Sequence, residues 1–99
     1  MPTFLDVDPR TLHVPPSRLT GADPAKLTRQ EQMFGSSVLG MPPPEVTRGA
    51  NSALMLNDGV TRATRVAKLL PRRLLRVEVT DDVPHWDMSK LPKIGDFVP

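Results

Sequence analysis

The sequence contains no cysteine, and only 4% of its 99 residues are aromatic. Without cysteine the chain has no disulfides, no zinc site with thiolate ligands and no thiol nucleophile. The shortage of aromatic residues leaves few large side chains for a core. A chain of this length buries only about 60–65% of the surface that it exposes when unfolded. We therefore expect one small domain of modest stability.

Long apolar runs and metal-binding patterns are also missing. No segment approaches the roughly 18 apolar residues of a membrane span. The first residues lack the charged and apolar regions of a signal peptide. These features predict a cytoplasmic protein with no membrane partner. His13 and His85 are far apart and share no metal-ligand spacing, so we also predict no metal site.

Positive charge is concentrated in one part of the chain. Residues 48–76 contain seven Lys or Arg and a single acid, Asp58. Residues 1–47 contain four Lys or Arg and five acids, and residues 77–99 contain two and five. Uneven charge of this kind predicts that an anionic partner is drawn to the basic segment.

The order of apolar, proline and glycine residues predicts an α+β fold with a small mixed sheet of about four strands and two packed helices. A helix is expected between residues 24 and 39, beginning either at Asp23-Pro24 or at a capping box over Thr28–Glu31. The other expected elements are a short edge strand at Phe4–Val7, strands at Glu45–Arg48 and Ser52–Leu56 that form a hairpin, a helix over 60–70, and a strand at 75–79. We divide the chain into a domain over 1–82 and a proline-containing tail over 83–99 that packs on it.

Apolar periodicity also predicts the core. The helix over 60–70 presents apolar residues at helical spacing, and the strand at 75–79 alternates apolar and polar residues. On this pattern Arg62 and Arg65 lie outside the core. The predicted core consists of Leu54, Leu56, Ala63, Val66, Ala67, Leu70, Leu75, Val77 and Val79.

The segment after the second hairpin strand has the composition of an anion site. Asp58-Gly59 ends the strand and opens a helix, whose first N–H groups and positive dipole end favour a phosphate. Gly59 permits close backbone approach, Thr61 offers a hydroxyl, and Arg62 and Arg65 share one helix face. An ordinary turn followed by solvated arginines is the alternative interpretation. Secondary basic contacts are expected from Arg18, Arg72 and Arg73.

This segment resembles the ParB/sulfiredoxin superfamily. The shared features are an apolar strand (Leu54–Leu56), Asp58, the motif Gly-x-x-Arg (Gly59 to Arg62), an alanine-containing helix and a Val-x-Val strand (Val77–Val79). The order of the upstream elements is similar as well. The resemblance implies a ParB-like fold over roughly residues 4–80 and a ligand that carries phosphate.

The chain also departs from the family pattern. Sulfiredoxins have a catalytic cysteine in this loop, so sulfiredoxin activity is excluded here. ParB-type nucleotide switches have Gly-Glu-Arg-Arg at this place, whereas Val60 and Thr61 replace the Glu and the first Arg. A helix-turn-helix domain follows this fold in ParB proteins, and 99 residues leave no room for one. We therefore expect a stand-alone, degenerate form of the domain.

Two functions follow as expectations. The first is binding of a nucleotide or a DNA backbone by Asp58, Gly59, Thr61, Arg62 and Arg65. If it is an enzyme, the resemblance implies a phosphoesterase, nuclease or nucleotide hydrolase with unassigned catalytic residues, and a nucleotide would bring Mg²⁺ with it. The second is a non-catalytic module of a phage or mobile element that binds a protein partner. A ligand at the Gly59 turn favours the first, and an apolar groove elsewhere favours the second.

Overall fold

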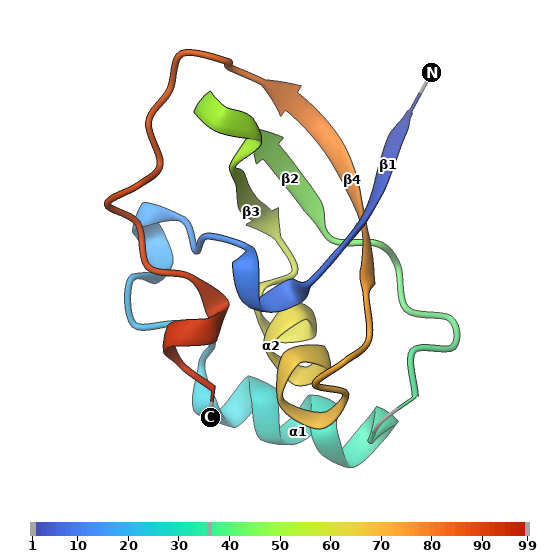
Figure 1. Cartoon of the computed structure of the whole chain (residues 1–99). Helices are drawn as coiled ribbons and strands as arrows, with labels where there is room; N and C mark the ends of the chain where they lie inside the picture. The colour runs from blue at the N-terminus through green and yellow to red at the C-terminus, as the bar shows by residue number, and fades with distance from the viewer. Residues whose placement is uncertain (1, 36, 99) are drawn as a thin grey trace.

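The computed structural model of the chain describes residues 2–35 and 37–98, so the outer ends of the predicted ranges 1–82 and 83–99 lie outside the described residues. Four strands and two α-helices are connected by loops and short 3₁₀ turns (Figure 1). Their order is β1 (Thr3–Val7), α1 (Pro24–Phe34), β2 (Glu45–Arg48), β3 (Leu54–Asp58), α2 (Val60–Leu69) and β4 (Leu75–Asp82). The predicted α+β class, with four strands and two helices, is confirmed.

The four strands form one mixed sheet in the order β1-β4-β2-β3. β1 pairs antiparallel with β4, β4 pairs parallel with β2, and β2 pairs antiparallel with β3. β1 is an edge strand and β2–β3 is a hairpin, both as predicted. The hairpin places the end of β3 next to the start of α2, on the side of the sheet where both helices lie (Figure 1).

Helix α2 is the element that joins the sheet to the rest of the domain. It begins immediately after Gly59 and ends before Pro71, whose ring cannot continue a helix. Ala63, Val66 and Ala67 are buried on its inner face, as their spacing predicts. Burial of a valine side chain stabilises a fold by roughly 1.5–3 kcal/mol, so this face is a major part of the small core.

Helix α1 is held differently. Asp23 caps it, because its Oδ1 accepts a hydrogen bond from the Ala25 N–H over 2.9 Å, and proline fills the first helical position. The start at Asp23-Pro24 is therefore correct, and the alternative start at Thr28 is not used. No residue of α1 is buried. The helix packs on α2, and an ion pair between Lys68 and Glu31, 2.8 Å long, joins the two.

Seven of the nine predicted core residues are buried, and Leu70 and Val79 are partly buried against the same cluster. The sequence pattern did not identify the contribution of two other segments. Leu12 and Val14 from the loop after β1 and Ile94 and Val98 from the C-terminal segment also belong to the core. Helical and strand periodicity cannot detect these residues, because they lie outside regular elements.

The segment at 12–14 joins the edge of the sheet to the C-terminal segment. The His13 N–H donates to Leu54 O and the Leu56 N–H donates to His13 O, both over 2.9 Å. On the other side, the Ile94 N–H donates to Leu12 O over 2.8 Å. These bonds cover the outer edge of β3 and hold residues 91–94 on the domain.

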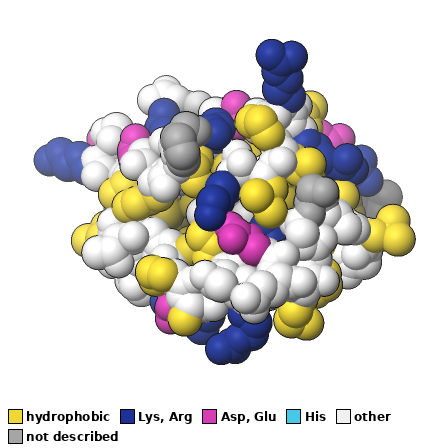
Figure 2. All heavy atoms as spheres, turned by 90° about the horizontal axis from the view of Figure 1, so that it is seen from below, with side chains coloured by type: hydrophobic (Ala, Val, Ile, Leu, Met, Phe, Trp, Pro, Cys, Tyr) yellow, Lys and Arg dark blue, Asp and Glu magenta, His cyan; other side chains and the backbone are white. Residues whose placement is uncertain are grey.

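Folding disperses the basic segment over several surfaces. Four of its seven cations pair with acids: Arg48 with Asp82, Arg62 with Asp58, Lys68 with Glu31 and Arg76 with Asp6. Seen from below, the Lys and Arg side chains are spread around the face and do not gather into one patch (Figure 2). The basic segment therefore does not form one continuous positive patch on this face.

Candidate functional site

The turn between β3 and α2 has a backbone that only glycine adopts without strain. Gly59 caps α2 with φ +95°, in the left-handed region. A Cβ at this position would lie 2.8 Å from the Cβ of Pro44 and 3.0 Å from Nη2 of Arg62. The requirement for glycine therefore has two causes, the positive φ and the buried proline packed against the turn.

The first turn of α2 is open to a ligand. Gly59 has no side chain with which to cap the helix, and the first turn contains no acid. The first N–H groups of an α-helix have no intrahelical acceptor, and the helix dipole places partial positive charge there. The backbone at Val60, Thr61 and Arg62 therefore offers donors to an anion.

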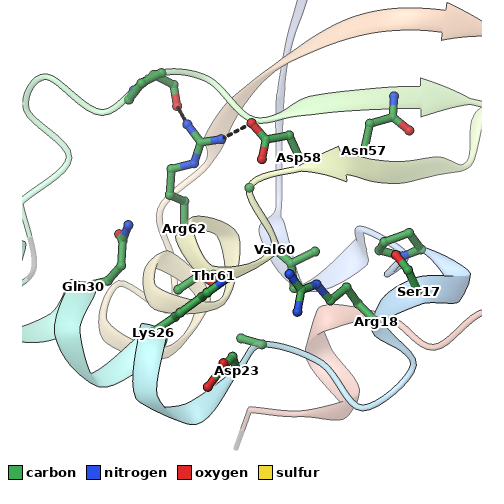
Figure 3. Close-up of a pocket in the computed structure, with 14 residues that line it drawn as sticks. Ser17, Arg18, Asp23, Lys26, Gln30, Asn57, Asp58, Val60, Thr61 and Arg62 are labelled. Carbon is green, nitrogen blue, oxygen red and sulfur yellow. Dashed lines mark hydrogen bonds and ion pairs between the residues drawn. The ribbon is translucent and has the colours of Figure 1, made fainter.

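This helix terminus forms one wall of a cleft of about 660 Å³. The opposite wall comes from Lys26 and Gln30 of α1 and from the 3₁₀ turn at Pro16–Arg18, as Figure 3 shows. The cleft is lined by Pro15, Ser17, Arg18, Ala22, Asp23, Lys26, Gln30, Pro42, Asn57, Asp58, Gly59, Val60, Thr61 and Arg62. The predicted site residues Asp58, Gly59, Thr61 and Arg62 thus share one cavity with the predicted secondary contact Arg18.

Arg18 and Lys26 are the cations best placed for a ligand. In Figure 3 both side chains extend into the space in front of Val60 and Thr61, from two different elements. Within residues 2–35 and 37–98, neither makes an ion pair or a side-chain hydrogen bond, and both are exposed. Their charges are therefore available to an anion at the start of α2.

Arg62 is held by its own chain. Its Nη2 donates to Asp58 Oδ2 over 3.0 Å, and its Nη1 donates to Pro42 O over 3.0 Å. The side chain keeps 16% of its exposure, whereas that of Asp58 keeps 68%. Arg62 therefore fastens the connector before β2 to the turn, and it also borders the cleft.

Arg65 is buried, so the prediction that it lies outside the core is wrong. Only 1% of Arg65 is exposed. Its Nη1 donates to Gly35 O over 2.7 Å and to Ser37 O over 2.8 Å, and the guanidinium lies 5.3 Å from the ring centre of Phe34. Burial lowers the pKa of Arg65 below its ordinary value. The side chain faces the loop after α1 instead of the cleft, because the loop carbonyls accept its N–H groups.

Arg72 and Arg73 are outside the cleft as well. They lie beyond the end of α2, where they border a second cavity with Leu69, Leu70 and Pro71. Lys26 also lines the cleft, although nothing in the sequence pattern marks it as a site residue. It is a single lysine in the first turn of α1, with no motif around it. Only the approach of α1 to the start of α2 brings it to the site.

Asn57 borders the cleft at the end of β3, and in Figure 3 its amide points away from Arg18. The Thr47 hydroxyl donates to Asn57 Oδ1 over 2.9 Å, and Asn57 Nδ2 donates to the Thr80 hydroxyl over 3.2 Å. These two bonds from neighbouring strands fix the amide. Asn57 therefore ties the end of β3 to the other strands beside Asp58.

The residues of the cleft do not fit a resident Mg²⁺ ion. Mg²⁺ prefers several oxygen ligands in octahedral geometry. Asp58 is paired with Arg62, and Asp23 caps α1. No group of three or more His, Asp or Glu side chains that could hold a metal occurs in the part of the chain that the structure describes. The cleft thus presents the cations Arg18 and Lys26 and the first N–H groups of α2, and its two carboxylates are already engaged.

Comparison with known proteins adds no family to this description. No protein-family model and no curated protein sequence matches the chain. None of the described helices has the length and apolar character that a membrane crossing requires.

Proposed function

We propose that the chain is a ParB-like domain that binds a phosphate-bearing ligand, a nucleotide or a nucleic-acid backbone, in the cleft in front of α2. One observation carries the proposal: Arg18 and Lys26, which have no ion-pair partner among the described residues, line the same cleft as the uncapped N-terminus of α2. Their charges come from separate elements and face the same backbone donors. A volume of about 660 Å³ is within the range of small-ligand sites.

The arrangement supports binding more than turnover. Hydrolysis of a phosphate ester needs a positioned base or a metal ion in addition to electrostatic stabilisation. The carboxylates of the cleft are Asp23 and Asp58, and each is engaged by a donor of the chain itself. Phosphoesterase or nuclease activity remains the secondary form of this proposal.

The test compares two substitutions on one helix. Lys26→Ala removes a cation from the cleft, and Arg29→Ala removes a cation from α1 that does not line it. A charge-assisted contact contributes about 1.5–3 kcal/mol, so Lys26→Ala should weaken phosphate or nucleotide binding by roughly ten- to a hundredfold. Arg29→Ala should change affinity several-fold at low salt and little at physiological ionic strength.

Binding is measured by titration of the ¹⁵N-labelled chain with inorganic phosphate, a nucleotide and a short DNA duplex. Both variants should fold, because neither side chain is buried. Equal losses for the two variants would mean a diffuse electrostatic effect and contradict a site. Absence of any shift at the amides of Val60–Ala63 would reject the proposal.

The alternative function is that of a protein-interaction module. A second groove with apolar lining residues, away from the cleft, favours it. The groove has a volume of about 300 Å³ and lies between the connector after α1 and the start of β4. Its apolar lining is Val38, Met41, Pro43, Leu74 and Leu75. This function would leave the cleft without an anion ligand, so the phosphate titration distinguishes the two proposals.

A further inference from the structure

The ion pair of Asp58 and Arg62 lies at the edge of the proposed phosphate site and engages one of its cations. In Figure 3 the Arg62 guanidinium points to Asp58 and away from Arg18 and Lys26. Asp58 is four residues before Arg62, a spacing that brings the two side chains together at the start of the helix. The chain therefore supplies its own anion to an arginine that lines the cleft.

We propose that Asp58 is a built-in competitor of the ligand, which holds Arg62 until a phosphoryl group takes its place. This inference rests on the proposed function, since it concerns regulation of the same cleft. A carboxylate and a phosphoryl group accept the same guanidinium hydrogen bonds. A ligand that binds Arg62 must first break the Asp58–Arg62 contact, and this cost weakens its binding. The affinity for phosphate is therefore lower than it would be without Asp58.

The exposure of Asp58 makes this exchange feasible. The Asp58 side chain keeps 68% of its exposure, so water readily solvates it when it leaves Arg62. Water screens the exposed Asp58 end of this ion pair, whereas the Arg62 end keeps only 16% of its side-chain exposure. Arg62 stays attached through Pro42 O, 3.0 Å away, and so remains at the cleft after Asp58 departs.

Asp23 offers a matched control. It lines the same cleft and carries the same charge, but among the described residues it contacts no cation. Its Oδ1 caps α1, a role that asparagine also fills. Asp23→Asn and Asp58→Asn therefore remove equal charge from the cleft, and only the second releases Arg62.

The experiment is a double-mutant cycle with inorganic phosphate as the probe. Affinity is measured from the amide shifts of Val60–Ala63 in the full chain, for D58N and D23N, each with Arg62 present and with R62Q. D58N should tighten phosphate binding about three- to tenfold, and D23N about twofold or less. In the R62Q background the gain from D58N should fall to that from D23N, because there is no arginine to release.

The possible outcomes separate the two proposals. Equal gains for D58N and D23N, or a D58N gain that persists with R62Q, would overturn the competitor role and leave phosphate binding intact. If phosphate shifts none of these amides in any variant, the proposed function itself is wrong. Should D58N fail to fold, the unmodified chain provides the measurement: phosphate must shift both the Arg62 ¹⁵Nε and the Asp58 carboxyl ¹³C resonances, and unchanged resonances overturn the inference.

Discussion

At the scale of single residues, Gly59 and Arg65 set the geometry around the cleft in different ways. Gly59 lets the turn pass against Pro44 and leaves the first turn of α2 uncapped. Arg65 has no part in the proposed phosphate site, yet it fixes the loop after α1 by donating to two of its carbonyls. Hydrogen bonds from a charged guanidinium are stronger than those between neutral groups, so the position of this loop depends on the arginine.

The two causes of the glycine requirement at position 59 can be separated by experiment. Gly40 has φ +72° and no atom within 4 Å of a Cβ placed on it, whereas a Cβ on Gly59 meets Pro44 at 2.8 Å. Gly40→Ala should therefore cost only the left-handed strain, about 1–2 kcal/mol. Gly59→Ala should cost roughly 1–3 kcal/mol more, because the neighbour must also shift. Urea denaturation measures both changes, and equal losses would show that crowding by Pro44 is unimportant.

At the scale of elements, the two helices differ in how firmly they are packed on the domain. α2 buries its apolar face in the core cluster that it shares with the strands. α1 has no buried residue and is joined to the domain by the Lys68–Glu31 ion pair and by its packing on α2. Yet α1 supplies Lys26 and Gln30 to the cleft. One wall of the proposed site is therefore the least buried helix of the fold.

This inequality predicts a difference in local stability. Segments with few buried apolar contacts open by local fluctuations without unfolding of the whole domain. The backbone amides of α1 should therefore exchange with solvent at least about tenfold faster than those of Val66 and Ala67 in α2. Native-state hydrogen exchange followed by NMR checks this. Identical protection in both helices would mean that α1 opens only when the domain unfolds.

At the scale of the whole molecule, residues distant in sequence share one core. Leu12 from the loop after β1 and Ile94 from the C-terminal segment are both fully buried, and a backbone hydrogen bond of 2.8 Å links them. The C-terminal segment therefore adds apolar burial that the sheet and the helices alone do not provide.

The contribution of this segment is measured by truncating one side chain. Ile94→Ala should lower the free energy of unfolding by about 2–5 kcal/mol, as expected for a fully buried aliphatic residue. Leu39, which is 87% exposed, provides the control: Leu39→Ala should change stability by less than about 0.5 kcal/mol. Thermal or urea unfolding gives both values. A small loss for Ile94→Ala would show that the segment contributes little to the core.

Local pattern predicted much of this fold, because the elements depend on neighbouring residues. Pro24 after Asp23 marks the start of α1, Gly59 marks the start of α2, and the spacing of Ala63, Val66 and Ala67 identifies its buried face. These signals act within a few residues. The sequence therefore determined the α+β class and placed the turn that borders the cleft.

The tertiary structure decided which charges meet. Arg62 and Arg65 lie on one side of α2 in the sequence pattern, but Arg65 is buried because the carbonyls of Gly35 and Ser37 lie over it. Lys26 comes to the cleft because α1 packs on α2, and the other basic residues are dispersed or paired with acids far along the chain. A sequence gives the number of charges but not the distances between them. The electrostatic field at a site depends on those distances and on burial, and both are set by the packing of the elements.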